Sequence, residues 1–345
     1  MRLWKRRHLK KFFGAGRVRF EDNPVRAAER AVKVDASLVC WSEPDPKLLR
    51  AAENRDCDLL RIEDGFLRSR GLGAELVPPL SLVRDATGIY FDPRQPSDLE
   101  HLIRQSVNLP PVSLERAKRL RETLLKLRLT KYNVGSTVSF DRPDGMDTVL
   151  VVGQVEDDAS VVCGAASPLN TNCALLSAAR KARPDAYLIY KPHPDVEAGL
   201  RKGRISADAA DIVARNAEPD ALIGAADEVW TMTSLLGFEA LIRGVKVVCA
   251  GRPFFAGWGI TTDLPCVLDA AIGSRRAGVN PSLDGLTHAT LIDYPRYHDP
   301  VTEHACPVEV AIERLASGQP AKTGQGLRLL SKLQGLLVSQ EPFWR

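Results

Sequence analysis

The feature that most constrains the fold is a regular alternation of short apolar runs and helical segments in the second half of the chain. Apolar runs at 147–152, 186–190, 228–231 and 246–250 are predicted strands, because each is short and bounded by polar residues. Helices are predicted between them at 169–181, 205–215 and 235–243. Strands that alternate with helices in this way form a parallel sheet, whose ligands bind at the carboxyl ends of the strands.

The first half of the chain repeats the pattern. Strands are predicted at 37–41 and 58–62 with a helix at 46–54 between them, and helices at 97–105 and 113–129 follow, with Ser97 and Ser113 as N-caps. A turn-rich stretch, Asp141 to Gly145, is the predicted domain boundary. With 345 residues the chain exceeds a single core. We therefore predict an α/β protein with two Rossmann-like domains, 21–145 and 146–325, facing across a cleft.

Two terminal segments flank these domains. Residues 1–20 interleave eight Lys and Arg residues with apolar side chains. This pattern is typical of a basic amphipathic segment on an anionic membrane surface. It equally fits a solvated basic arm that begins an ordinary domain, and both interpretations stay open here. Residues 326–345 carry a leucine stripe at helical spacing, which predicts a helical tail that packs onto the body of the protein.

Composition narrows the class of protein. Apolar residues make up 44% of the chain and charged residues 26%, which is ordinary for a soluble globular protein. The seven cysteines form no CxxC pair, so we expect reduced thiols and a cytoplasmic protein. No apolar run is long enough to span a membrane. Nucleic-acid binding is not favoured, because the basic excess is confined mainly to the first twenty residues.

An acidic pair follows the predicted strand at 58–62. Glu63 and Asp64 precede Gly65, which permits a tight turn that directs both carboxylates toward a ligand. Two carboxylates close together hold one proton near neutral pH, as a general acid/base requires. Arg68 and Ser69 follow as candidate substrate contacts, and Arg68 offers a bidentate fork to a carboxylate. The alternative is a solvated turn or a helix cap.

A second acidic segment follows the strand at 147–152. It begins at Gln154, a candidate substrate contact, and continues through Glu156, Asp157 and Asp158 to Ser160. The acidic run lacks a spaced DxD, so we do not expect a metal. A carboxylate here can act as a nucleophile at an anomeric carbon and be displaced again. A solvated acidic loop with an N-cap is the other interpretation.

A basic-His-Pro turn follows the strand at 186–190. His193 has a proline on each side, and these prolines fix the backbone so that the imidazole projects from the strand end. His193 and Lys191 are candidates to bind or protonate a departing phosphate.

Two further segments follow predicted strands. Thr233 and Ser234 begin a predicted helix, where hydroxyls and free N–H groups suit a phosphate, and Glu239 is placed to accept hydrogen bonds from a ribose. A plain N-cap with a buried or ion-paired Glu239 is equally compatible. Trp258 lies in an aromatic, Gly-rich loop and could cover a base or sugar face, or pack against the core.

Several of these stretches, in this order, resemble one family. The matching segments are Arg61 to Ser69, Pro79 to Val83 with Gly88 to Tyr90, Lys131 to Asn133, Gln154 to Ser160, Lys191 to Pro194, Pro253 to Gly259, and Tyr294 to Tyr297 with Asp299 and Pro300. From about Val39 to Ala316 the chain resembles the KpsC/LipB-type capsule polysaccharide proteins. These are retaining glycosyltransferases that transfer β-Kdo, where Kdo is 3-deoxy-D-manno-oct-2-ulosonic acid.

The resemblance implies a GT-B-like fold, CMP-β-Kdo as donor, and retention through a covalent adduct, with no cofactor or metal. It implies Asp158 as nucleophile, with Asp157 as runner-up, and Glu63 and Asp64 as acid/base and substrate contacts. It also implies CMP contacts by three residues: His193, Ser234 and Glu239. The implied acceptor is an anionic glycan or glycolipid, so a peripheral contact with the anionic inner membrane is part of the expectation.

Other functions remain open at this stage. A CMP-sugar transferase that works by direct displacement, as bacterial sialyltransferases do, shares an acidic pair before Gly and a His-Pro motif. A non-catalytic nucleotide- or glycan-binding module serving capsule export is a third reading, which the intact acidic segments disfavour. Many relatives join two transferase modules, whereas this chain has one, so we expect it to add a single Kdo or to work with a partner.

Overall fold

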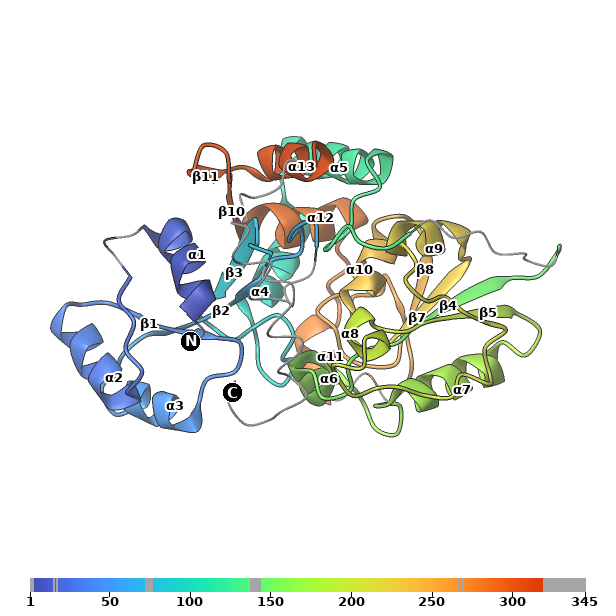
Figure 1. Ribbon diagram of the computed structural model, residues 1–345, viewed down its shortest axis with the longest axis horizontal. Coiled ribbons are helices and arrows are strands. Elements are labelled where there is room, and N and C mark those ends of the chain that lie inside the picture. Colours follow the sequence, from blue (N-terminus) through green and yellow to red (C-terminus); the bar gives the residue numbers. More distant parts are fainter. Residues whose placement is uncertain are drawn as a thin grey trace. The chain divides into compact units, whose positions relative to one another are not determined.

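The computed structural model describes residues 3–14, 16, 18–71, 77–136, 144–265, 267 and 270–318 (Figure 1). Contacts within the chain define two compact units. Unit 1 contains residues 1–89, 131–134 and 294–345, and unit 2 contains residues 90–130 and 135–293. The sequence placed one boundary at residue 145, but the chain instead passes between the units four times. The predicted helical tail, 326–345, lies outside the described residues.

Unit 2 is built on a parallel sheet. Its spatial order is β6-β5-β4-β7-β8-β9, and every neighbouring pair is parallel. The strands are β4 (Thr148–Val152), β5 (Tyr187–Lys191), β6 (Ile212–Val213), β7 (Glu228–Thr231), β8 (Lys246–Cys249) and β9 (Thr262–Asp263). Counted along the chain, this order is 3-2-1-4-5-6, the doubly wound arrangement, and the winding direction reverses between β4 and β7.

The two central strands of unit 2, β4 and β7, are buried on both faces, which explains the apolar run at 149–152 in β4. All five residues of β4 and all four of β7 are buried. The surrounding helices are α6 (Ala159–Gly164), α7 (Asn172–Ala182), α8 (Pro194–Glu197), α9 (Pro219–Ala225), α10 (Leu235–Leu241) and α11 (Ala270–Arg276). Helices α7 and α9 both pack against β4 and lie on opposite sides of the sheet (Figure 1). The predicted strands of this half are confirmed, and so are its helices except one.

The helix predicted at 205–215 is wrong. The segment contains the short strand β6, which pairs with β5 at the edge of the sheet. Asp211 fixes this pairing, because its backbone N–H donates to Leu188 O and its carboxylate accepts from Leu188 N at 2.7 Å. Pairing at the sheet edge therefore overrides the local helical preference of an alanine-rich segment.

A second group of helices belongs to unit 2. It comprises α4 (Asp98–Gln105), η2 (Ser106–Asn108), α5 (Pro111–Lys126), α12 (Leu283–Thr287) and the π-helical turn η3 (His288–Asp293). Helix α5 packs on α12, and α4 packs on η3. The predicted cap at Ser97 is confirmed, since its hydroxyl accepts from Glu100 N at 3.1 Å. The predicted cap at Ser113 is wrong, because α5 begins two residues earlier at Pro111, which suits a first helical position.

Unit 1 has a mixed sheet of order β1-β2-β3-β10-β11. Only β1 and β2 are parallel, and the other neighbours are antiparallel. The predicted βαβ unit is confirmed, while the rest departs from a Rossmann-like sheet. The elements are α2 (Pro24–Lys33), β1 (Leu38–Trp41), α3 (Pro46–Glu53), β2 (Leu59–Asp64), β3 (Ser81–Asp85), β10 (Pro295–His298), β11 (Ala305–Cys306) and α13 (Val308–Ala316).

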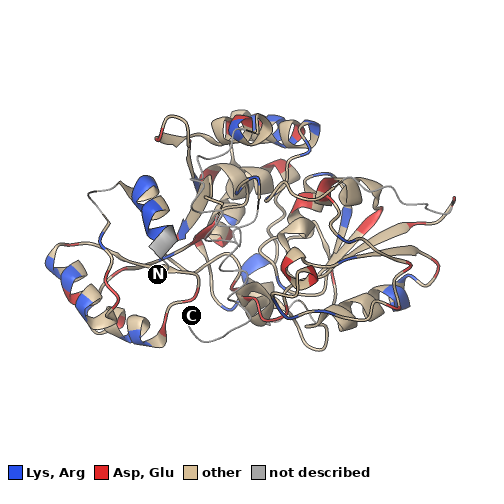
Figure 2. Ribbon diagram, viewed as in Figure 1, with Lys and Arg blue, Asp and Glu red and all other residues tan. Residues whose placement is uncertain are grey.

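The basic N-terminal segment is part of unit 1. Residues Leu3–Phe13 form α1, and Leu9, only 2% exposed, packs against Ile62 and Leu82 of the sheet. The helix therefore uses apolar side chains for folding, while Arg7, Lys10 and Lys11 of this helix are exposed. Figure 2 marks its Lys and Arg positions in blue. It is not a free arm. No helix among the described residues is long and apolar enough to cross a membrane.

Candidate functional site

In unit 2, three of the sequence motifs follow adjacent strands. Gln154 follows β4, His193 follows β5, and Thr233 follows β7, with β4 lying between the other two strands. Because parallel strands end at the same edge, these motifs lie at the carboxyl edge of the sheet. Two of them flank the reversal between β4 and β7, which is the usual ligand position in doubly wound sheets.

Hydrogen bonds connect the β4 and β7 motifs. Gln154 Nε2 donates to Thr233 Oγ1 at 2.9 Å, and Gln154 Oε1 accepts from Thr233 N at 2.8 Å. Thr233 Oγ1 in turn lies 3.4 Å from Ser160 Oγ, and Ser160 Oγ donates to Asp158 Oδ1 at 2.7 Å. A continuous network thus runs from the buried Gln154 to the carboxylate of Asp158.

Two further residues fix the position of Gln154. Asn172, 1% exposed, accepts from Gln154 N through Oδ1 at 2.8 Å, and its Nδ2 donates to Gln154 O at 2.7 Å and to Gly203 O at 2.8 Å. At Gly153 a side chain is excluded, because an added Cβ would lie 2.4 Å from Tyr190 Oη. Hydrogen bonds from Asn172 and close packing against Tyr190 therefore fix the turn after β4.

The three acidic residues after β4 have separate partners. Asp158 is exposed and caps α6, and only its Oδ1 takes part in hydrogen bonds among the described residues. Asp157 pairs with Arg201 at 3.0 Å. Glu156 accepts from the backbone N of Asn172 at 2.8 Å. The three carboxylates therefore have three different roles: Asp158 caps α6, Asp157 forms a surface ion pair, and Glu156 contacts the start of α7.

The two basic residues at the end of β5, His193 and Lys191, have different environments. His193 Nδ1 accepts from Asp195 N at 3.1 Å, so in the neutral ring the proton is on Nε2, which is then a donor. Lys191 is buried. Burial lowers the pKa of its ammonium, and the nearby Glu197 and Glu239 carboxylates oppose this change. His193 Nε2–H and the amino group of Lys191 can each donate a hydrogen bond to a phosphate.

The motif after β7 is partly used for capping. Ser234 Oγ accepts from Leu236 N at 3.2 Å and begins α10, while Ser234 N donates to Thr231 Oγ1 at 3.0 Å. Glu239 is buried in α10, and its charge acts on Lys191. Nothing in the sequence indicated that these two residues lie close together.

Trp258 has a packing role. Its ring is 1% exposed, its Nε1 donates to Phe254 O at 2.8 Å, and the Arg276 guanidinium lies 5.4 Å from the ring centroid. Arg276 also donates to Pro253 O and Ala256 O, and pairs with the buried Glu100 at 3.0 Å. A ring enclosed in this way offers no face to a ligand, so we drop Trp258 from the candidate ligand contacts.

The second group of predicted site residues lies in unit 1, at the end of β2. Arg68 Nε donates to Asp64 Oδ2 at 2.7 Å, and Arg68 Nη1 donates to Ser69 Oγ at 2.8 Å. Arg68 is only 1% exposed. Among the described residues, Asp64 Oδ1 and Arg68 Nη2 are buried without a hydrogen-bond partner. Each atom belongs to a side chain whose other polar atoms form the Asp64–Arg68 hydrogen bond.

Glu63 has a carboxyl group suited to proton transfer. Burial, followed by the negative charge of Asp64, raises its pKa to about 7. The charges of Lys5 and Lys131 and the backbone N–H of Asp64 act in the opposite direction. A group with this pKa can release or accept a proton near neutral pH.

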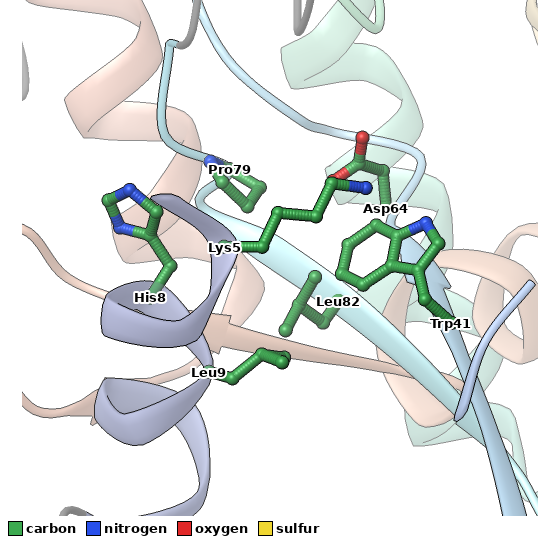
Figure 3. Close-up of a pocket in the computed structure, with 7 residues that line it drawn as sticks. All are labelled: Lys5, His8, Leu9, Trp41, Asp64, Pro79 and Leu82. Atoms are coloured by element: carbon green, nitrogen blue, oxygen red, sulfur yellow. The ribbon is translucent and has the colours of Figure 1, made fainter. Parts of the chain in front are cut away.

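A pocket adjoins Asp64 in unit 1 (Figure 3). Its walls come from α1, from the ends of β1 and β2, and from β3 with the residues before it. The lining residues are Lys5, His8, Leu9, Trp41, Asp64, Pro79 and Leu82. Burial is the main cause of a lowered His8 pKa, about 4, so His8 is neutral at pH 7. Lys5 and Asp64 are therefore the charged groups of this lining.

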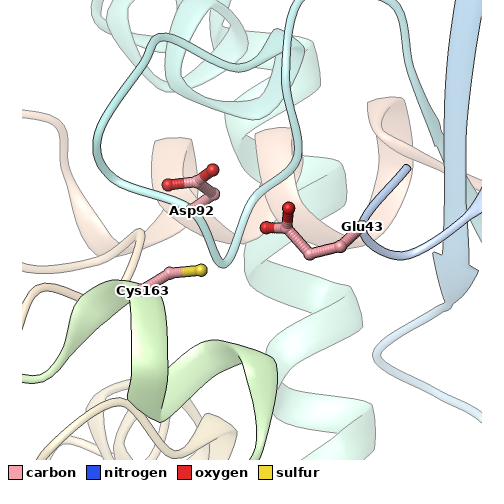
Figure 4. Close-up of side chains that lie close together, drawn as sticks. All are labelled: Glu43, Asp92 and Cys163. Atoms are coloured by element: carbon pink, nitrogen blue, oxygen red, sulfur yellow. The ribbon is translucent and has the colours of Figure 1, made fainter. Parts of the chain in front are cut away.

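Unit 2 also contains a thiol beside a carboxylate. The Sγ of Cys163 and a carboxylate oxygen of Asp92 lie within 4.8 Å of each other (Figure 4). Asp92 is already neutralised by Arg94, whose Nε and Nη2 donate to it at 2.7 and 2.8 Å. We therefore assign this pair no chemistry. Glu43, also drawn in Figure 4, belongs to unit 1.

The chain was compared with known proteins. The model of a family described as "Capsule polysaccharide biosynthesis protein" matches residues 36–134 and 131–297. The chain belongs to this family. Capsule polysaccharide modification protein LipA of Neisseria meningitidis serogroup A is 44% identical over 322 residues, which cover 91% of this chain and 44% of LipA. The chain thus spans about half the length of that curated relative. Lipopolysaccharide-processing protein LpsZ of Rhizobium meliloti is 41% identical over 94% of this chain and 75% of LpsZ.

Two solved structures share the fold. Thermosulfurimonas dismutans KpsC, described as a β-Kdo 2,4 transferase, is 30% identical with a TM-score of 0.76, and covers 90% of this chain and 94% of its own. A second KpsC structure from the same organism, described as a β-Kdo 2,7 transferase, is 32% identical with a TM-score of 0.72, and covers 92% and 97%. The predicted GT-B-like α/β fold class and the predicted family are confirmed.

Sequence reasoning missed three residues that organise these sites. Ser160 connects Asp158 to Thr233, Asn172 holds Gln154, and Lys5 lines the pocket beside Asp64. Ser160 was visible as the end of the acidic segment. Asn172 carried no signal, because an asparagine at a helix start is normally a cap or a turn residue.

Proposed function

We propose that this chain is a retaining glycosyltransferase that transfers β-Kdo from CMP-β-Kdo to a glycan or glycolipid acceptor in capsule or surface polysaccharide biosynthesis. The family and the two KpsC structures support a Kdo transferase. The single observation that carries the proposal is Asp158, an exposed carboxylate held through one oxygen at the carboxyl edge of a doubly wound sheet.

The first step takes place on unit 2. Asp158 attacks the anomeric carbon of CMP-β-Kdo, a C–O bond to the carboxylate forms, and CMP departs with the electrons of the broken C–O bond. His193 donates to the leaving phosphate through Nε2–H, and Lys191 offsets its charge. Asp158 is favoured over Asp157, because Asp157 is engaged by Arg201.

The second step uses the carboxylates of unit 1. An acceptor hydroxyl attacks the anomeric carbon, its proton passes to Glu63, and the bond to Asp158 breaks. Two inversions leave the β configuration in place. Glu63 suits this role because its pKa is raised to about 7, mainly by burial. Asp64 is paired with Arg68, so we assign Asp64 to orienting the acceptor and Arg68 to holding Asp64, while Ser69 accepts a hydrogen bond from Arg68.

Binding of CMP is assigned to unit 2. Gln154, Thr233 and Ser234 place polar groups at the sheet edge, and Glu239 could accept from the ribose. We propose transfer without a metal. The separate partners of Glu156, Asp157 and Asp158 support this, since a metal site needs its oxygen ligands to converge.

The proposal includes a cytoplasmic location with a peripheral contact to an anionic membrane. Exposed basic residues of α1, such as Arg7 and Lys10, support an electrostatic contact (Figure 2). The apolar face of α1 is used inside unit 1, so such a contact would weaken steeply as salt rises.

The decisive experiment compares wild type with Asp158→Ala and Asp158→Asn, using CMP-Kdo generated in place and a synthetic β-Kdo glycolipid. Loss of the nucleophile should lower acceptor-dependent CMP release by at least about a thousandfold. Asp157→Asn is the matched control, since it removes a neighbouring carboxylate at the surface, and should retain most activity. Near wild-type turnover by Asp158→Ala would exclude Asp158 as nucleophile.

A further inference from the structure

Helix α1 covers the face of the unit 1 sheet that carries Asp64. Asp64 stands opposite Leu82 in the antiparallel pairing of β2 with β3, so their side chains share one face. Ile62, two residues before Asp64, lies on the same face. Leu9 packs on Ile62 and Leu82, which places α1 over this face.

Lys5 projects from α1 toward the carboxylate. It lies one helical turn before Leu9, so both residues occupy the same face of the helix. Its Nζ is 3.2 Å from the centroid of the Trp41 ring, which holds the side chain in place. Figure 3 shows the ammonium of Lys5 directed toward the carboxylate of Asp64 across the pocket that both line.

The position of α1 is fixed from several sides. Lys11 pairs with Glu303 at 2.6 Å, and Arg6 pairs with Asp22 at 2.8 Å. The ring of Phe12 lies 5.4 Å from that of His298 of β10. Lys5 is therefore carried by a docked helix.

We propose that Lys5 is a positioning residue of the Glu63–Asp64 pair, which balances the charge of Asp64 and so keeps Glu63 able to accept a proton near neutral pH. This inference rests on the proposed function, in which Glu63 is the base.

The other charges near Glu63 do not replace Lys5. Asp64 is the last residue of β2 and pairs with Arg68, four residues later. Lys131, in the segment that hydrogen-bonds to Arg68 and Ser69, is the second cation that lowers the pKa of Glu63. His8 is neutral at pH 7 because burial lowers its pKa. Burial and the charge of Asp64 raise the pKa of Glu63, and Lys5 and Lys131 lower it. When Lys5 is removed, Lys131 is the one remaining cation of these two.

Removal of Lys5 changes the pKa of Glu63 in one direction. Without Lys5 the pKa of Glu63 rises further, so less of it is ionised at neutral pH and the base form is depleted. Raising the pH restores the base form. On the acid side, each unit of upward shift lowers the rate about tenfold.

The first test is the pH dependence of kcat/KM for wild type, Lys5→Met and Lys5→Arg. Lys5→Met should shift the acid limb to higher pH by about one unit and recover at alkaline pH, whereas Lys5→Arg should keep the wild-type limb. Lys33→Met is the control, because it removes an exposed cation of unit 1 that does not line the pocket. An unshifted limb in Lys5→Met, or an equal shift in Lys33→Met, would overturn the inference.

A second readout is independent of activity. Glutamate side chains labelled with 13C at the carboxyl carbon are titrated by NMR, and Glu63→Gln identifies the Glu63 signal. In Lys5→Met this signal should titrate at higher pH than in wild type. A shifted titration in a chain that transfers no Kdo would uphold the Lys5 inference and reject the proposed function. An unchanged titration in an active enzyme would reject Lys5 alone.

Discussion

Asn172 shows how much one side chain can fix at the candidate site. Its amide satisfies the N–H and C=O of Gln154 and the C=O of Gly203, all within the protein interior. A buried polar group left without a partner costs about 1–3 kcal/mol. Gln154 in turn positions Thr233, so a change at Asn172 reaches both motifs beside β4 and β7.

Asn172→Ala should lower the free energy of unfolding by at least about 2 kcal/mol, because several buried groups lose partners together. It should also reduce transfer. Urea denaturation measures the first effect. Thr171→Ala, which removes only the neighbouring cap of α7, is the comparison and should cost about 1 kcal/mol. Equal losses in the two variants would contradict the role given to Asn172.

Residue-scale prediction from sequence succeeded where a motif directly follows a strand. Gln154, His193 and Thr233 could be placed at one sheet edge because parallel strands end together. Burial was harder to foresee. Trp258 lies inside the core because Arg276 and Glu100 enclose its loop, and Glu100 is remote from it in sequence. Likewise, the partner of Arg68 is Asp64, which only the turn geometry reveals.

At the scale of elements, the turn after β4 depends on Gly153. An added Cβ would lie 2.4 Å from Tyr190 Oη and 3.1 Å from Lys191 O, so β4 and β5 would have to separate. Gly153→Ala should therefore destabilise the protein by about 1–3 kcal/mol and displace Gln154. Gly224→Ala in α9 meets nothing within 4 Å and should stabilise by about 0.5–1 kcal/mol. Thermal unfolding compares them, and a neutral Gly153→Ala would contradict this packing.

The contact between α4 and α11 predicts a pH effect on stability. Burial raises the pKa of Glu100, but the hydrogen bonds and charges of Arg275 and Arg276 outweigh it, so the net pKa is lowered. A carboxyl with a lowered folded pKa stabilises above its unfolded pKa, about 4.3, and loses this contribution as the pH falls.

Glu100→Gln should cost about 3–5 kcal/mol at neutral pH, because Arg276 would keep a buried charge without its partner. The difference from wild type should shrink as the pH falls below about 4. Urea denaturation of wild type and Glu100→Gln across this pH range measures the difference in the free energy of unfolding. A difference that is constant with pH would show that packing, and not the charge of Glu100, is responsible for it.

Element prediction failed where pairing between distant segments decides. β6 forms because β5 offers an edge, and β10 joins β3 across about two hundred intervening residues of sequence. Strand β6 has only two residues, which carry little periodic signal of their own. By contrast, β4 is buried on both faces, and its apolar sequence was sufficient to locate it.

At the scale of the whole molecule, the chain crosses between its two units four times, so a single linker at residue 145 could not describe it. Sequence periodicity finds elements but not which unit each joins. The fold class was nevertheless predictable, because repeated strand–helix alternation permits few architectures. The donor and acceptor roles that we propose for the units follow from their side chains, with the proposed nucleophile and CMP contacts in unit 2 and the carboxylate pair in unit 1.

The most direct test of the central claim is the anomeric configuration of the product. Purified protein, CMP-Kdo generated in place and a synthetic β-Kdo glycolipid are incubated, and the new linkage is determined by NMR. The account predicts acceptor-dependent release of CMP and a product in the β configuration. An α-linked product would show direct displacement and contradict the covalent adduct, and the absence of any transfer from CMP-Kdo would contradict the proposed function.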